Sequence, residues 1–107
     1  MRPAQLNINL YKGQTWEKKF KFSVDGSSMS LDGYAFKAQI RPSVNSNVLS
    51  AEMTVSQEDD CVTLSLSANQ TADLTGTLVW DLRSEDENQK VDYWLYGNIT
   101  INGRVTV

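Results

Sequence analysis

Few side chains in this sequence could carry out chemistry. Histidine is absent, so the commonest general base and metal ligand is missing. The one cysteine, Cys61, follows Asp59 and Asp60 and precedes an alternating run that starts with Val62. If Val62 faces inward, the thiol of Cys61 faces outward, beside two acids that disfavour a thiolate. We therefore expect Cys61 to be a poor nucleophile, and a single cysteine allows no internal disulfide.

Two acidic clusters, residues 57–60 and 84–89, are the candidates for binding a cation. Neither has the D-x-[DN]-x-[DN]-G spacing of a calcium loop, and both lie between alternating runs. Solvated hairpin tips are the favoured interpretation, and a calcium site is the alternative. Nothing marks a pair of carboxylates facing each other across a cleft, as glycoside hydrolysis requires. We predict no catalytic residue, no metal and no cofactor, so the chain is expected not to be an enzyme; a hydrolase is the remaining enzymatic alternative.

A basic run, with Lys18, Lys19 and Lys21 around Phe20, could contact nucleic acid. The chain as a whole is acidic, with a net charge of −3 and a pI near 4.8, whereas nucleic-acid modules usually carry a basic excess. Lysines on a strand also protect an exposed sheet edge against unwanted pairing. No nucleic-acid partner is therefore predicted.

Length and composition indicate one compact domain, residues 1–107. Hydrophobic residues make up 40% and charged residues 21%, as in ordinary globular proteins. No apolar stretch of about 20 residues and no signal sequence is found, so no membrane association is expected. With one cysteine the fold must be held by packing, which is compatible with a reducing cytoplasm.

Alternation of apolar and polar residues predicts an all-β fold. About seven short runs alternate with a period of two and are separated by turn residues, which is typical of a β-sandwich or barrel. In the fourth run Leu49 and Met53 are expected to face inward, and residues 62–66 are expected to form a hairpin with it across the first acidic cluster. The runs cover residues 6–11, 15–24, 34–41, 49–55, 62–66, 77–83 and 91–101.

Residues 68–74 interrupt this pattern and predict a short helical turn. Ser67 is a good N-cap, the stretch has no β-branched residue before Thr71, and Gly76 is a candidate C-cap. We expect the turn to carry the chain from one sheet to the other and to cover the open end of the core with Ala68, Ala72 and Leu74.

Four segments resemble a known family: LDGYAFKAQIR, VTLSLSANQTADL, VWDLR and LYGNITI. They are similar to small immunoglobulin-like β-sandwich proteins and domains of tailed bacteriophages, including the N-terminal domains of baseplate upper proteins. Relatives often read D-L-T-G-Y-x-h-x-A-Q-I-R, V-T-L-S-L-S-x-x-x-T-x-x-L, Y-D-L and a terminal G-x-V-T-V. The resemblance covers residues 5–101. Trp80 departs from the usual Tyr, and the C-terminus is longer, which leaves open whether the tail NGRVTV packs on its own domain or on a neighbour.

In an immunoglobulin-like sandwich of about seven antiparallel strands, the third, sixth and seventh runs share a sheet. If Tyr93 and Leu95 face inward, Trp94 faces outward. Exposed aromatics among polar groups are typical of an interface. The alternative is that the chain's own tail or loops cover this strand. The predicted interface face is formed by Lys37, Gln39, Val79, Asp81, Trp94 and Tyr96.

The resemblance implies a structural component of a tailed-phage virion, assembled in the host cytoplasm. It would lie in the tail, baseplate or fibre-attachment region, or else decorate the head. Its partners would be other phage structural proteins, contacted in many copies within a symmetric assembly. The alternative is a carbohydrate-binding module for the host surface, with Trp94 and Tyr96 stacking on sugar rings.

Overall fold

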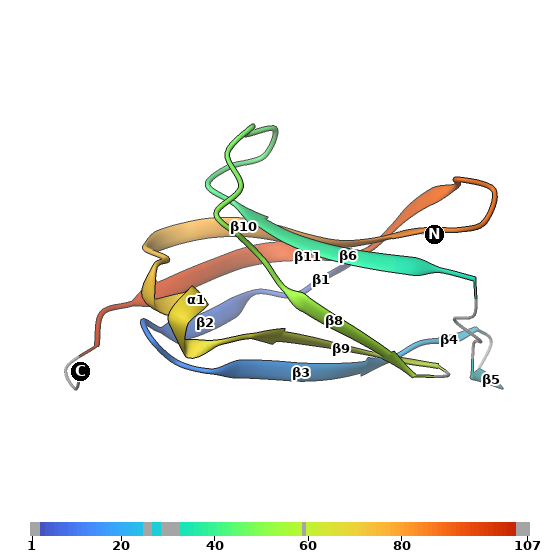
Figure 1. The fold of residues 1–107 in the computed structure, drawn as a ribbon, viewed down its shortest axis with the longest axis horizontal. Helices are drawn as coiled ribbons and strands as arrows, with labels where there is room; N and C mark the ends of the chain where they lie inside the picture. The colour runs from blue at the N-terminus through green and yellow to red at the C-terminus, as the bar shows by residue number, and fades with distance from the viewer. Residues whose placement is uncertain (1–2, 25–26, 29–32, 59, 105–107) are drawn as a thin grey trace.

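The computed structural model describes residues 3–24, 27–28, 33–58 and 60–104. In these residues two larger β-sheets pack face to face, with one short helix at one end (Figure 1). The all-β sandwich is thus confirmed. The turn predicted around residues 25–28 lies partly outside the described residues, and so does the end of the C-terminal tail, residues 105–107.

The larger sheet contains all three runs that were expected to share a sheet. They form β6 (Ala35–Arg41), β10 (Gly76–Glu85) and β11 (Val91–Asn102), in the order β11-β10-β6, and each adjacent pair is antiparallel. β7 (Ala51–Glu52) adds to the far edge of β6.

The N-terminal run departs from the expected antiparallel pairing. β1 (Ala4–Gln5) and β2 (Ile8–Tyr11) both pair in parallel with β11. Parallel neighbours cannot be joined by a tight turn, and here nearly the whole domain forms the connection between them. Sequence periodicity contains no signal for strand direction, so this pairing could not be read from it.

The smaller sheet has the order β3 (Trp16–Lys21), β9 (Cys61–Leu66), β8 (Thr54–Glu58), and both of its pairings are antiparallel. The hairpin predicted across the first acidic cluster is therefore present as β8 and β9. A separate two-stranded ladder joins β4 (Ser23–Val24) to β5 (Ser27–Ser28).

Alternating side chains from both sheets form the core, as the pattern predicts. Leu49 is an exception, because it is 45% exposed although it was expected to face inward. The chain leaves the larger sheet at Pro42 and rejoins it only at β7, so Leu49 lies in a projecting loop. Met53, in the same predicted run, is buried. Fully buried members of the core include Leu10, Ala38, Ile40, Val62, Leu64, Leu82 and Ile99.

The helical turn is α1 (Ala68–Ala72), and it connects β9 of the smaller sheet to β10 of the larger one. Ser67 caps it through a capping box with Gln70. Thr71 is fully buried and its hydroxyl donates to the Gln14 carbonyl oxygen at 2.7 Å. This end of the core is covered by Thr71 and Leu74.

Two details predicted for this turn are wrong. Ala68 is exposed, because it lies on the outer side of the short helix. The C-cap is Asp73, and Gly76 instead starts β10 with a positive φ of 73°.

Candidate functional site

The outer face of the larger sheet brings together most of the predicted interface residues. The registers of β6, β10 and β11 place Gln39, Asp81 and Tyr96 directly beside one another in one row. Two further rows flank this one. We call the face formed by all three rows the outer polar face; its members are Lys37, Gln39, Arg41, Val79, Asp81, Arg83, Tyr93, Tyr96 and Asn98.

The prediction that Trp94 lies on this face is wrong. The register between β10 and β11 shifts, so that Leu82 pairs with Leu95 while the next residue, Arg83, pairs with Tyr93. Trp94 is the extra residue of a β-bulge, which inverts the alternation that precedes it. Trp94 and Leu95 are therefore both buried, whereas Tyr93, expected to face inward, is 46% exposed.

Trp94 has a structural role in the core. Its ring lies 4.8 Å from that of Phe22 and 5.7 Å from that of Phe36, measured between centroids. Its indole Nε1 donates to the hydroxyl of Ser84 at 2.8 Å, and Ser84 is itself buried. The side chain is therefore held beneath the sheet and cannot stack on a ligand at the outer polar face.

A hollow of about 540 Å³ lies on the outer polar face. Its lining includes four predicted residues, Gln39, Val79, Asp81 and Tyr96, while Lys37 and Trp94 are not among the residues that line it. The loop at residues 43–46 forms part of its wall. This loop belongs to a projection that rises above the sandwich at the top of Figure 1. The volume is within the range of small-ligand sites.

Arg41 joins the floor of the hollow to this wall. Its guanidinium donates to Gln39 Oε1 at 3.0 Å and to the Ser46 carbonyl oxygen at 3.3 Å. Two of its five N–H groups are thus used to fix the side chain, and the others are available to a ligand. Arg41 and Arg83 were not predicted as site residues, although each continues the outward alternation of its strand.

Asp81 lies at the centre of the face. Burial raises the pKa of its carboxyl group above the ordinary value of 3.8, and the nearby Arg83 and Arg41 partly oppose this rise. Asp81 is also the one carboxyl-bearing residue among the described residues that line the hollow. The hollow therefore presents a mixture of donors, acceptors and phenol rings, without a pair of carboxylates.

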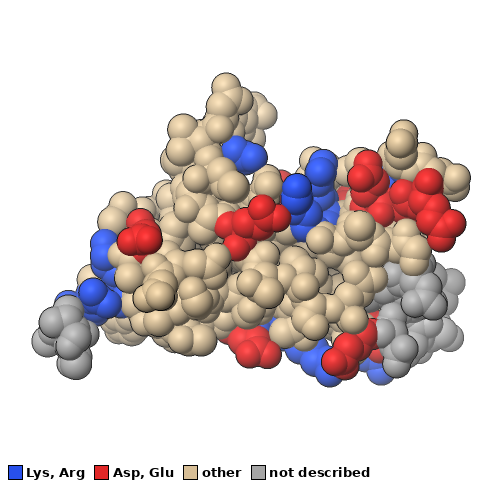
Figure 2. Space-filling model, viewed as in Figure 1, with Lys and Arg blue, Asp and Glu red and all other residues tan. Residues whose placement is uncertain are grey.

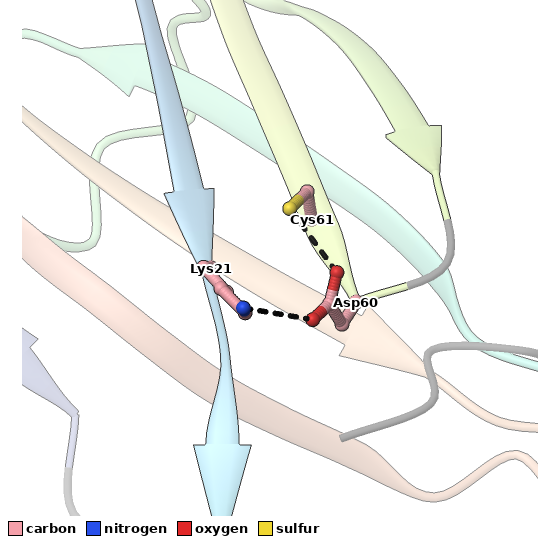
Figure 3. Close-up of polar contacts among 3 residues, drawn as sticks. All are labelled: Lys21, Asp60 and Cys61. Atoms are coloured by element: carbon pink, nitrogen blue, oxygen red, sulfur yellow. Dashed lines mark hydrogen bonds and ion pairs between the residues drawn. The ribbon is translucent and has the colours of Figure 1, made fainter. Parts of the chain in front are cut away.

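Cys61 lies on the smaller sheet, away from this site. Its thiol donates to Asp60 Oδ1 at 3.3 Å, and Lys21 Nζ lies 3.6 Å from Asp60 Oδ2 (Figure 3). The hydrogen bond to Asp60 is the main cause that raises the pKa of the Cys61 thiol, followed by burial and the charge of Asp60. A raised pKa lowers the fraction of thiolate at neutral pH, which agrees with the expectation that Cys61 is a weak nucleophile.

Within residues 3–24, 27–28, 33–58 and 60–104, no group of three or more His, Cys, Asp or Glu side chains is arranged to hold a metal ion. No helix in those same ranges is long and apolar enough to cross a membrane.

Comparisons with known proteins bear on the fold. Neither a protein-family model nor a curated protein matches the sequence. Among solved structures, the chain is similar to part of an endo-fucoidan hydrolase from glycoside hydrolase family 107, with a TM-score of 0.56 and 12% identity. The match covers 94% of this chain but 13% of the hydrolase chain. At this identity the likeness concerns the sandwich fold alone.

Proposed function

We propose that this protein is a non-catalytic structural component of a tailed-phage virion, acting through protein–protein contacts. The observation that carries the proposal is the projecting loop of residues 42–50. Three aliphatic side chains on it are exposed, Val44 by 74%, Val48 by 62% and Leu49 by 45%. Soluble proteins rarely leave apolar side chains gathered at one projection unless another surface covers them.

Hydrogen bonds preorganise this loop. The Ser46 N–H donates to the Ser43 carbonyl oxygen at 3.2 Å, and the Val48 N–H donates to Ser46 Oγ at 3.1 Å. Arg41 ties the same turn to the sheet. A loop held by its own hydrogen bonds loses less conformational entropy on binding, which favours association.

Sequence and fold give further support. The four motifs that resemble phage sandwich proteins lie on β6, on β9 with α1, on β10 and on β11. A rigid sandwich with an exposed apolar projection suits repeated contacts in a symmetric particle. The partners would be other structural proteins of the tail, baseplate or fibre-attachment region, or of the head surface. Assembly would take place in the host cytoplasm.

Complementation of a phage that lacks the gene tests this proposal. The pair of changes Val48→Ser and Leu49→Ser should lower incorporation into particles at least tenfold, while the melting temperature of the isolated protein stays unchanged. The matched control is Tyr11→Ser with Val91→Ser, which removes two exposed apolar residues on other parts of the surface. Equal incorporation of both double variants would show that the loop is not the contact.

The hollow favours a second candidate, a carbohydrate-binding module. Two phenol rings, Tyr93 and Tyr96, are 46% and 44% exposed beside polar side chains, an arrangement suited to sugar rings and their hydroxyls. The structurally similar protein is named as a hydrolase of fucoidan, a polysaccharide, and this chain resembles a small part of it. Because Trp94 is buried, calorimetric titration of saccharides is the suitable assay. Binding that Tyr96→Ala abolishes and Tyr11→Ala leaves intact would support the second candidate.

A further inference from the structure

The charges on and around the outer polar face balance. Six charged side chains lie on this face or continue its rows: Lys37, Arg41, Arg83, Asp81, Glu52 and Glu85. Glu52 continues the Gln39 row on β7, and Glu85 lies in the outward row beyond Arg83 on β10. Three positive and three negative charges leave no net charge. In Figure 2 basic and acidic side chains are interspersed between the projecting loop and the β10–β11 hairpin. The face as a whole therefore does not select an ion of either sign.

Inside the hollow, charges of both signs lie near one another. Of the six side chains, Arg41, Arg83 and Asp81 line it. Two positive charges and one negative charge leave +1 there, and the three side chains outside it, one positive and two negative, leave −1. The charges of both arginines reach Asp81, because they oppose the rise of its pKa. Asp81 would repel an anionic ligand and the arginines would repel a cationic one, so the hollow suits a neutral polar ligand best.

The carboxylate of Asp81 is available to accept hydrogen bonds from a ligand. Within the part of the chain that the structure describes, no hydrogen bond or salt bridge joins it or the guanidinium of Arg83 to another residue. A carboxylate only accepts and a guanidinium only donates, whereas a hydroxyl group does both. Two neighbouring hydroxyls of one sugar can therefore donate to Asp81 and accept from Arg83. Arg41 adds its remaining N–H groups, from a side chain already held by Gln39 and Ser46.

Tyrosine rings lie beside both of these charged groups. Tyr96 is the register partner of Asp81 and Tyr93 is that of Arg83, so two adjacent rows each pair a charged side chain with a phenol ring. A sugar ring has hydroxyls at its edge and C–H groups on its faces, which suits polar groups next to exposed aromatic rings. The centre of a protein interface is instead mainly apolar and depleted in charge. The arrangement therefore favours a saccharide over a second copy of this chain.

We propose that the hollow on the outer polar face binds a neutral oligosaccharide. Adjacent hydroxyls of one sugar ring bond with Asp81 and Arg83, and a C–H face of this ring lies against Tyr96. Arg41 donates to a hydroxyl of the next sugar. The proposal rests on the second candidate function, and it names the ligand class and the side chains that select it.

Calorimetric titration of the full chain tests the proposal with five probes: neutral maltotriose, cellotriose and mannotriose, anionic tri-galacturonate and cationic tri-glucosamine. We expect at least one neutral probe to bind about tenfold or more tightly than either charged probe, because no net charge attracts an ion. The affinity for the neutral probe should change less than about twofold as salt rises, since no ion pair is screened.

Two variants within the hollow and one outside it locate the site. Asp81→Ala should weaken binding about tenfold or more, as loss of a charge-assisted hydrogen bond predicts, and Arg83→Gln should weaken it about fivefold or more. Glu85→Ala removes a carboxylate from the same strand but outside the hollow, and should change the affinity less than about twofold. Thermal melting establishes that each variant is folded, and Arg83→Gln provides the test if Asp81→Ala is not.

Several results would overturn the proposal. These are no binding of any neutral probe at millimolar concentration, equal or tighter binding of a charged probe, or equal losses in a hollow variant and Glu85→Ala. A dimer in sedimentation that Tyr96→Ala dissociates would assign the face to a second copy of the chain. If a charged saccharide alone binds, the carbohydrate-binding function stands and this inference fails. The virion proposal is judged separately, by particle incorporation.

Discussion

Gly97 allows the segment between β1 and β2 to pack closely against β11. A Cβ added at this position would lie 1.9 Å from the Leu6 carbonyl oxygen and 2.6 Å from the Leu6 carbonyl carbon. Both are backbone atoms, so no side-chain rotation could make room. Glycine inside a strand often marks such a close approach of another backbone. Gly97→Ala must therefore push the segment between β1 and β2 away from β11.

Three hydrogen bonds depend on this close approach. The Leu6 N–H donates to the Tyr96 carbonyl oxygen at 2.8 Å. The indole Nε1 of buried Trp80 donates to the Leu6 carbonyl oxygen at 3.0 Å, and the Asn98 N–H donates to Asn7 Oδ1 at 3.1 Å. At about 0.5–1.5 kcal/mol each, their loss predicts a destabilisation of about 2–4 kcal/mol. A melting temperature lower by about 10 °C or more follows for a domain of this size.

Urea unfolding followed by tryptophan fluorescence measures this cost. The matched control is Gly103→Ala, because no atom lies within 4 Å of the added Cβ there and its φ is not positive. The control should change the free energy of unfolding by less than about 0.5 kcal/mol. An equally small change in Gly97→Ala would refute the close packing of the N-terminal segment.

Three further changes have expected outcomes. Ser67→Ala removes the helix cap and should cost about 1 kcal/mol in urea unfolding, with Ser67→Thr close to wild type. Trp94→Phe keeps an aromatic ring but leaves the buried Ser84 hydroxyl without its donor, and should cost about 1–3 kcal/mol; a neutral result would contradict the buried bulge. Asp81→Asn tests how stability depends on pH. Because the pKa of Asp81 is raised in the folded protein, the native state binds a proton at this carboxyl group more tightly than the unfolded state does. The free energy of unfolding therefore falls as pH rises from 3.8 through the raised pKa. In Asp81→Asn this fall should be smaller, and the variant should melt above wild type at pH 7; identical melting curves across this range would contradict it.

Much of the architecture was predictable because several strands, β2, β6, β9 and β10 among them, bury one face and alternate in sequence. The run from Ala35 to Arg41 is an example: Ala38 and Ile40 are buried and the intervening side chains face outward. The capping residue Ser67 and the change of sheet after β9 could also be read directly, because local turn chemistry specifies both.

The candidate site was predictable only in part. Gln39, Asp81 and Tyr96 were assigned to one face correctly, since their strands keep the period of two up to the bulge. A bulge adds one residue without changing composition, so the sequence could not show that Trp94 turns inward and Tyr93 outward. The wall of the hollow comes from the loop at residues 43–46, whose position depends on tertiary contacts such as that between Arg41 and Ser46.

Quantitative mass spectrometry of purified phage particles tests the central claim most directly. The account predicts that this chain co-purifies with the particles at a fixed copy number that is a simple multiple of the symmetry of the tail or head. Absence of the chain from particles, while it is abundant in the infected-cell lysate, would contradict a structural role in the virion.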